Sequence, residues 1–320
     1  MRAIESIPLE AIEAARARIE GGAVRTPLIQ LDVEGAPAEI WLKLENLQPI
    51  GSFKVRGAGN AMALAGPDRL ARGVYTASAG NMAQGVAWNA RRLGVPCHVI
   101  VPDHAPLAKL DAMERLGARP IKLPFDAWWR VLATGEYAGV EGLFIHPVCD
   151  ADVIAGNGTV GLEIVEDLPD VDAVIVPYGG GGLSSGIASA IHAVKPGTKI
   201  WASEIATAAP LAASLAAGEQ REVEYTPSFV DGIGGKSVLD PMWSLVRRLL
   251  AGSLVVDLDE TAAAVRLLAT RCRVIAEGAG ATSVAAALSG GAGSGKVVCV
   301  VSGGNIDAAK LARILEGETP

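Results

Sequence analysis

The chain of 320 residues contains a lysine in an unusual local setting, within the run SFKVRGA at positions 52–58. Ser52 is a good helix N-cap and a helical run follows, which predicts Lys54 in the first turn of a helix. A cation is unfavourable there because the helix dipole is positive at that end. Such a local conflict is typical of functional sites, and a lysine with a lowered pKa can form a Schiff base with a carbonyl cofactor. The alternative interpretation of this lysine, considered without the rest of the chain, is an ordinary solvated lysine on the surface.

A second segment, ASAGNMAQG at positions 77–85, follows a predicted strand and opens a predicted helix. Successive backbone N–H groups at such a turn can hold a carboxylate. The amide of Asn81 can donate to a phenolic or carboxylate oxygen. The segment therefore predicts an anion-binding loop, with an ordinary turn capped by Ser78 and Asn81 as the alternative.

A third segment is a run of four glycines, Gly179–Gly182, between an apolar strand and a helix that begins near Leu183. Consecutive glycines lose much conformational entropy on folding, and they are expected where backbone must curl around a phosphate at a helix N-terminus. A dinucleotide fingerprint needs glycine at i, i+2 and i+5, but the last position counted from Gly179 is Ser184. The run thus favours a phosphate cup over a nicotinamide site, although Glu204 lies where a ribose-binding acid would be expected.

A fourth segment, VVSGGNID at positions 300–307, ends a predicted buried strand in a small polar turn. Ser302 would lie at the carboxyl end of that strand, where doubly wound sheets place their ligands. Its neutral hydroxyl could bond a ring nitrogen, and a plain strand end is the alternative.

Short apolar strands alternate with alanine-rich helical segments along most of the chain. Predicted strands are 40–44, 73–76, 97–101, 120–123, 173–177, 199–203, 254–256 and 296–301; predicted helices include 9–19, 81–93, 108–116, 161–166, 184–194, 260–272 and 307–315. Apolar strands separated by amphipathic helices indicate parallel sheets covered on both faces. Because the units are too many for one open sheet, we expect two α/β domains with a cleft between them.

Composition excludes several classes of protein. The net charge of −7 and the absence of a basic run argue against nucleic-acid binding. No apolar run approaches the ~20 residues of a membrane helix. The four cysteines are scattered, which argues against a disulfide framework or a zinc site. Because the N-terminal segment carries charges throughout, it is not expected to be a signal peptide, and a cytoplasmic location is predicted.

The four segments, in this order, resemble the pyridoxal-phosphate (PLP) enzymes of fold type II, the tryptophan synthase β class. Within that class the match is closest to the threonine/serine dehydratases and serine racemase. The resemblance implies two doubly wound α/β domains with mainly parallel sheets and the cofactor in the cleft between them. It implies a large domain of residues 1–50 and 146–320, a small mobile domain of 51–145, and a homodimer or higher homo-oligomer. Since the sequence stops at Pro320, we expect no C-terminal regulatory domain.

The resemblance also assigns roles to individual residues. Lys54 matches the lysine that binds PLP covalently and moves the Cα proton. Phe53 matches the residue stacked on the pyridine ring, Asn81 the partner of the ring 3-hydroxyl and Ser302 the partner of the ring nitrogen. The cofactor-phosphate cup corresponds to Gly179, Gly180, Gly181, Gly182 and Leu183, and the substrate-carboxylate loop to Ser78, Ala79, Gly80, Asn81, Met82 and Gln84.

Departures from the family pattern refine these expectations. Serine racemase has a second acid/base serine where this chain has Ala79, so elimination is favoured over racemisation. Met82 replaces a histidine, which predicts a more apolar rim. Glu204 matches the first acid of the family's divalent-metal site, but Pro210 stands where a later aspartate is needed. We therefore predict no strong divalent-metal site, with Glu204 as a weak candidate, and a monovalent cation stays open.

The expected activity is dehydration of a β-hydroxy L-amino acid, by default threonine or serine, to a 2-oxo acid and ammonia. Alternatives are a bulkier substrate such as phenylserine or a hydroxyectoine-pathway intermediate, a serine racemase, and a non-enzymatic nucleotide-sensing protein in which Lys54 is idle. The resemblance places Glu277 and Asp231 near the cofactor, although a helix start and a plain turn would explain them equally well. Trp128 and Trp129 are interpreted as packing residues.

Overall fold

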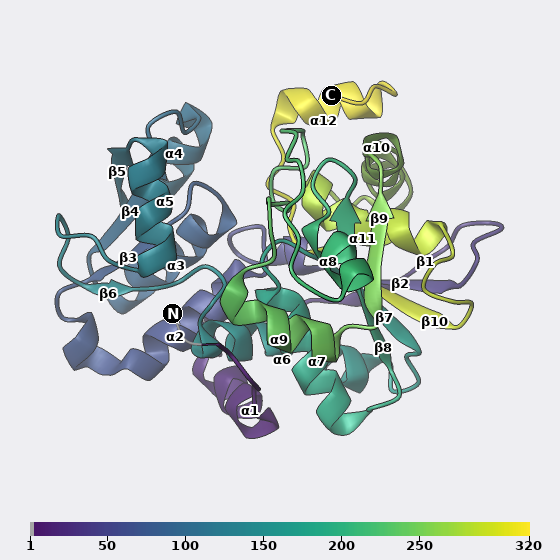
Figure 1. Cartoon of the computed structure of the whole chain (residues 1–320), viewed down its shortest axis with the longest axis horizontal. Coiled ribbons are helices and arrows are strands. Elements are labelled where there is room, and N and C mark those ends of the chain that lie inside the picture. The colour runs from purple at the N-terminus through teal and green to yellow at the C-terminus, as the bar shows by residue number, and fades with distance from the viewer. Residues whose placement is uncertain (1–2) are drawn as a thin grey trace.

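The computed structural model describes residues 3–320, and its strands form two separate sheets in two lobes (Figure 1). The six-stranded sheet of the large lobe has the order β1-β2-β10-β7-β8-β9, and only the β1–β2 pair is antiparallel. Its strands are β1 (Leu28–Leu31), β2 (Glu39–Lys43), β7 (Ala173–Pro177), β8 (Lys199–Ile205), β9 (Gly252–Val256) and β10 (Lys296–Val300).

Helices cover both faces of this sheet, as the apolar strands predict. In β7, Val174 and Val176 pack in one apolar core, while Ala173 and Ile175 pack in the other. Because successive side chains of a strand point to opposite faces, each face of the sheet packs against its own layer of helices. The first layer includes α1 (Leu9–Arg18), α6 (Ala151–Asp167), α7 (Gly182–Val194), α8 (Pro210–Ala217) and α9 (Asp240–Leu249). The second includes α10 (Leu258–Leu267), its π-helical extension Leu268–Cys272, α11 (Gly278–Leu288) and α12 (Ala308–Leu315).

The small lobe contains a four-stranded parallel sheet of order β5-β4-β3-β6. Its elements are α2 (Lys54–Leu70), β3 (Val74–Ala77), α3 (Asn81–Leu93), β4 (Cys97–Pro102), α4 (Leu107–Arg115), β5 (Arg119–Leu123), α5 (Phe125–Thr134) and β6 (Leu143–Phe144). Helices α2, α3 and α4 share one apolar core, whereas α5 packs against the other face through Val131.

Helix α2 links the lobes, since it packs against α6 of the large lobe and α3 of the small one. A buried charge network fixes its first turns to the large lobe. Arg56 donates to both carboxylate oxygens of Glu45 at 2.8 Å and to Glu163 at 2.6 and 2.9 Å. Lys43 approaches the same Glu163 carboxylate at 2.6 Å, and the four side chains are buried. Two cations and two anions thus balance beneath the helix that carries Lys54.

The two α/β lobes and the mainly parallel sheets confirm the predicted fold class. The sheets also fall within the predicted domain ranges, but the exact boundaries at 51 and 145 stay a prediction. Strands β1 and β6 and helices α5, α8 and α9 were not predicted. Among residues 3–320, no helix has the length and apolarity needed to cross a bilayer.

Two predictions at helix starts are wrong. Helix α6 begins at Ala151, ten residues before the predicted Gly161, because its early glycines are contact points rather than breakers. A Cβ on Gly156 would lie 2.6 Å from the carbonyl oxygen of Arg56, so glycine allows α2 and α6 to touch. Ser52 does not cap α2: the N-cap residue is Phe53, and the buried Ser52 hydroxyl has no hydrogen-bond partner.

Candidate active site

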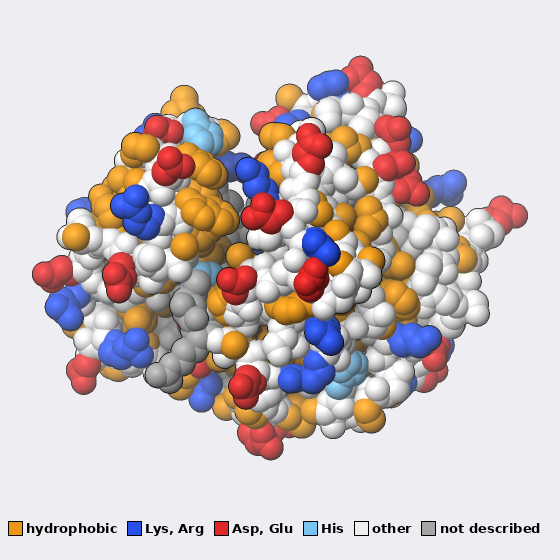
Figure 2. Space-filling model, in the orientation of Figure 1, with side chains coloured by type: hydrophobic (Ala, Val, Ile, Leu, Met, Phe, Trp, Pro, Cys, Tyr) orange, Lys and Arg blue, Asp and Glu red, His pale blue; other side chains and the backbone are white. Residues whose placement is uncertain are grey.

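A cavity of about 410 Å³ lies between the lobes, at the carboxyl ends of strands from both sheets. Ala77, Pro102 and Pro177 end β3, β4 and β7 and line it, and Ser302 follows β10. Parallel strands place their ligands at this edge, where turns and helix starts meet. Figure 2 shows the groove between the two lobes that marks the region from outside.

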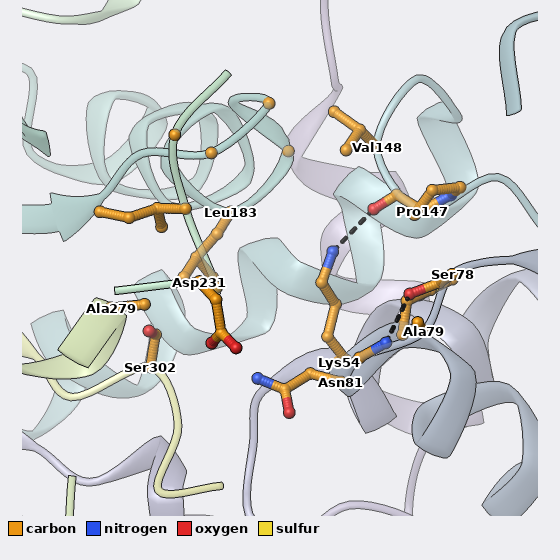
Figure 3. Close-up of a pocket in the computed structure, with 18 of the residues that line it drawn as sticks. Lys54, Ser78, Ala79, Asn81, Pro147, Val148, Leu183, Asp231, Ala279 and Ser302 are labelled. Atoms are coloured by element: carbon orange, nitrogen blue, oxygen red, sulfur yellow. Dashed lines mark hydrogen bonds between the residues drawn. The ribbon is translucent and has the colours of Figure 1, made fainter. Parts of the chain in front are cut away.

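Lys54, the first residue of α2, extends its side chain within this cavity (Figure 3). Its Nζ donates to the carbonyl oxygen of Pro147 at 2.8 Å and lies 5.1 Å from the centre of the Phe53 ring. Burial lowers the pKa of Lys54 to about 8, because a desolvated ammonium is disfavoured. Near neutral pH far more of this amine is therefore unprotonated than of an ordinary lysine, as a nucleophile or base requires.

The glycine run forms a cup between β7 and the start of α7. Gly181 has φ 92°, in the left-handed region that favours glycine, and a Cβ on Gly180 would lie 2.7 Å from both methyl carbons of Val148. A side chain at either of these two positions would therefore be crowded or strained, and backbone N–H groups at the start of α7 are available to an anion. Gly179, Gly180, Gly181, Gly182 and Leu183 all line the cavity, as a phosphate site requires.

Asn81 connects the lobes at the cavity wall. Its Nδ2 donates to Glu277 Oε1 at 2.8 Å, and its Oδ1 accepts from Asn305 Nδ2 at 2.8 Å. Glu277 lies at the N-cap of α11 and is buried, which raises its pKa to about 7. Ser302 is buried nearby and lines the cavity across from Lys54 (Figure 3). The prediction that Asn81 and Ser302 meet Lys54 at one site is consistent with this geometry.

The loop before α3 contributes backbone more than side chains. The Ser78 hydroxyl accepts from the Gly80 N–H at 3.2 Å and so shapes the turn. Ala79, Gly80 and Met82 also line the cavity, and Met82 is buried in the small-lobe core, which supports the prediction of an apolar rim. Gln84 is the one predicted site residue of this loop outside the cavity: it faces an adjoining cleft of about 450 Å³.

Glu204 does not line the cavity. Its carboxylate accepts from the backbone N–H groups of Leu211 and Ala212 at 2.9 and 2.7 Å, and from Ser253 Oγ at 2.6 Å. Those bonds give it a role at the start of α8. Within the described part of the chain, no group of three or more His, Cys, Asp or Glu side chains could hold a metal ion, so Glu204 has no ligand set around it.

Several cavity residues were not predicted from the sequence. Lys109 of α4 donates to Asp231 of the large lobe at 2.9 Å, which bridges the lobes. Trp128 packs against the small-lobe core, as interpreted, but it also lines the cavity with Phe125 and Leu132. The spacing i, i+3 and i+7 of these three α5 residues is a helical face that could have revealed them. Trp129 is half exposed and does not line the cavity.

Comparison with known proteins shows which family the chain is similar to. Residues 19–303 match the family model described as pyridoxal-phosphate dependent enzyme. The chain is 42% identical over 315 residues to an L-threonine ammonia-lyase of Thermotoga maritima, covering 97% of this chain and 78% of that protein. A structure of threonine deaminase isoform 2 from Solanum lycopersicum superposes with a TM-score of 0.86 at 31% identity, covering 98% of this chain and 89% of that one. A structure of maize serine racemase superposes with a TM-score of 0.85 at 31% identity, and the match covers 98% of each chain.

The residues present fit the cofactor of that family. The cup closed to side chains suits a phosphate, a buried amine with a lowered pKa suits covalent attachment, and a serine at the end of β10 suits the ring nitrogen. The expected resemblance, fold type and cofactor are confirmed by the family match and the structural neighbours. The chain belongs to the family of pyridoxal-phosphate-dependent enzymes.

Proposed function

We propose that this protein is an ammonia-lyase that converts a β-hydroxy L-amino acid, with threonine and serine as defaults, to a 2-oxo acid and ammonia. The names of its relatives support this, since they include L-threonine ammonia-lyases and a threonine deaminase. The observation that carries the proposal is the pairing of a buried basic Lys54 with an alanine, Ala79, on the loop before α3. Lys54 can take a proton, and Ala79 offers no second acid or base.

PLP, when bound, supplies an electron-withdrawing system that makes the substrate Cα–H bond acidic. The backbone of Gly179–Gly182 holds the phosphate, and Ser302 supplies a neutral hydroxyl for the ring nitrogen. Asn81 supplies an amide donor for the ring hydroxyl. The N–H groups of the Ser78–Gly80 turn orient the substrate carboxylate. Lys54 removes the Cα proton, which prepares loss of the β-hydroxyl.

The direct test is 2-oxo acid formation from L-threonine and L-serine by the purified protein supplied with PLP. Replacing Lys54→Ala removes the base and should lower kcat by about 10²–10⁴-fold. The matched control is Lys122→Ala on the exposed surface of β5, which should retain full activity. A wild-type protein that binds PLP but forms no 2-oxo acid from either substrate would contradict the proposed activity.

Racemisation is the second candidate, favoured by the structural likeness to maize serine racemase. It needs a group that returns a proton on the face opposite Lys54, and the resemblance places Ala79 at that position. We expect wild type to form D-serine much more slowly than 2-oxo acid, and Ala79→Ser to raise D-serine formation. Chiral chromatography of both products checks this. A racemase rate that exceeds the lyase rate in wild type would make racemisation the main function.

The assembly, location and domain division are further parts of the proposal. We propose a cytoplasmic homodimer or higher homo-oligomer whose small domain, residues 51–145, moves relative to residues 1–50 and 146–320. Light scattering during size-exclusion chromatography gives the assembly state, and a monomer mass would overturn it. Dependence of activity on potassium would support a monovalent cation, which the sequence leaves open.

A further inference from the structure

One wall of the cavity has no task in PLP binding or in holding the substrate carboxylate. It is formed by Phe125, Trp128 and Leu132, from one face of α5. The rings of Phe125 and Trp128 are 5.5 Å apart between centroids, and Trp129 lies 6.1 Å from Trp128 on the outer side. The contact with the Phe125 ring, which also lines the cavity, holds the indole as part of this wall.

The α5 wall lies close to where a substrate must bind. Helix α5 packs on β3 and β4, and β3 runs directly into the Ser78–Gly80 turn. Strand β6, beside β3, leads to Pro147, whose carbonyl oxygen accepts from Lys54. The wall, the carboxylate turn and the partner of the catalytic lysine are therefore parts of one sheet edge. Figure 2 shows hydrophobic side chains along the small-lobe side of the groove.

The charged side chains of the cavity do not offer a partner to a charged substrate side chain. Within the described residues those that line it are Lys54, Lys109, Asp231 and Glu277. Lys109 and Asp231 bond each other at 2.9 Å, and Glu277 accepts from Asn81 at 2.8 Å. Lys54 is the residue that we assign to PLP attachment and to removal of the Cα proton, so it is not a partner for a substrate side chain. A substrate side chain thus finds an apolar wall, a Lys109–Asp231 ion pair that is already neutralised and a Glu277 carboxyl that is already hydrogen-bonded. Burying a lone charge there would be costly.

We propose that Trp128, flanked by Phe125 and Leu132, contacts the β-substituent of the substrate and selects β-hydroxy amino acids whose β-substituent is apolar. The preference rises from hydrogen in serine, through methyl in threonine, to phenyl in phenylserine. This inference rests on the proposed function. Trp128 is a specificity residue: the apolar contact it makes is absent for serine and grows with the substituent.

The experiment compares kcat/KM for serine, threonine and phenylserine in wild type, Trp128→Ala and Trp129→Ala. A contact of this size in an apolar pocket changes selectivity by about 10–200-fold. We expect Trp128→Ala to lower the phenylserine-to-serine ratio by at least about tenfold, with little change for serine itself. Trp129→Ala is the matched control, because Trp129 packs on Trp128 but does not line the cavity, and its ratios should equal those of wild type. Leu132→Ala should lower the ratio less.

An unchanged ratio in Trp128→Ala would overturn the inference, as would a ratio that rises, since the indole would then exclude bulk. Equal effects of Trp128→Ala and Trp129→Ala would also overturn it, because α5 would then act only through packing. Trp128→Ala and Trp129→Ala should both retain the absorbance of bound PLP, and loss of that absorbance would reveal a folding defect. Failure of the proposed function looks different: no substrate gives 2-oxo acid in wild type.

Discussion

The helix that carries Lys54 is anchored by buried charges, whereas one bridge between the lobes at the cavity, the Lys109–Asp231 ion pair, is much more exposed. Arg56 bonds Glu45 and Glu163 out of solvent in the first turn of that helix. By contrast, the side chains of Lys109 and Asp231 are 38% and 46% exposed. Buried pairs are strongly sensitive to loss of one partner, and exposed ones contribute little. The difference indicates that the helix with the catalytic lysine is fixed to the large lobe, while the Lys109–Asp231 bridge is weak enough for the closing movement that we propose.

The largest stability effect should come from breaking the buried network. Arg56→Ala leaves Glu45 and part of Glu163 buried without a cation, which should lower the free energy of unfolding by about 3–5 kcal/mol. Arg25→Ala is the control: it removes exposed ion pairs to Glu166 and Asp167 and should cost about 1 kcal/mol or less. Denaturant titration measures both. Similar losses of unfolding free energy in the two variants would contradict the distinction between buried and exposed ion pairs.

A second effect concerns the pH dependence of stability through Glu277. Because burial raises its folded pKa to about 7, from 4.5, the folded state binds more protons than the unfolded state between these values. The stability linked to this carboxyl is fully present below pH 4.5 and is lost as pH rises through 7, by about 3 kcal/mol in total. Glu277→Gln, which still accepts from Asn81, should lack this decline. Parallel pH profiles of wild type and variant would contradict the buried, protonated carboxyl.

The smallest effect is expected at the bridge between the lobes. Lys109→Ala should change stability by about 1 kcal/mol or less and raise KM by about fivefold or less, since a less populated closed state binds substrate more weakly. Added salt should produce a similar rise in wild type, because exposed pairs are screened. Lys122→Ala serves as the surface-lysine control. A large loss of stability in Lys109→Ala would mean that the bridge is structural rather than a closing contact.

Much of the large lobe and most of the site could be predicted from the sequence, because its signals are local. The apolar strand before Gly179–Gly182, the lysine at a helix start and Ser302 after a buried strand each follow from a few neighbouring residues. The α5 wall was missed for the opposite reason. Trp128 becomes a cavity residue only because α5 packs on β3 and β4 and turns one face to the other lobe. The Lys109–Asp231 bridge joins residues 122 positions apart, which no local pattern reveals.

The central claim is that Lys54 is the one lysine that binds PLP, and one measurement tests it most directly. The protein is freed of PLP, mixed again with PLP over a range of pH and reduced with borohydride. The masses of its proteolytic peptides are then measured by mass spectrometry. We predict the cofactor mass on Lys54 alone, with a rate of attachment that rises with pH through about 8 as the buried amine loses its proton. Label spread over other lysines, or no label on Lys54, would contradict the account.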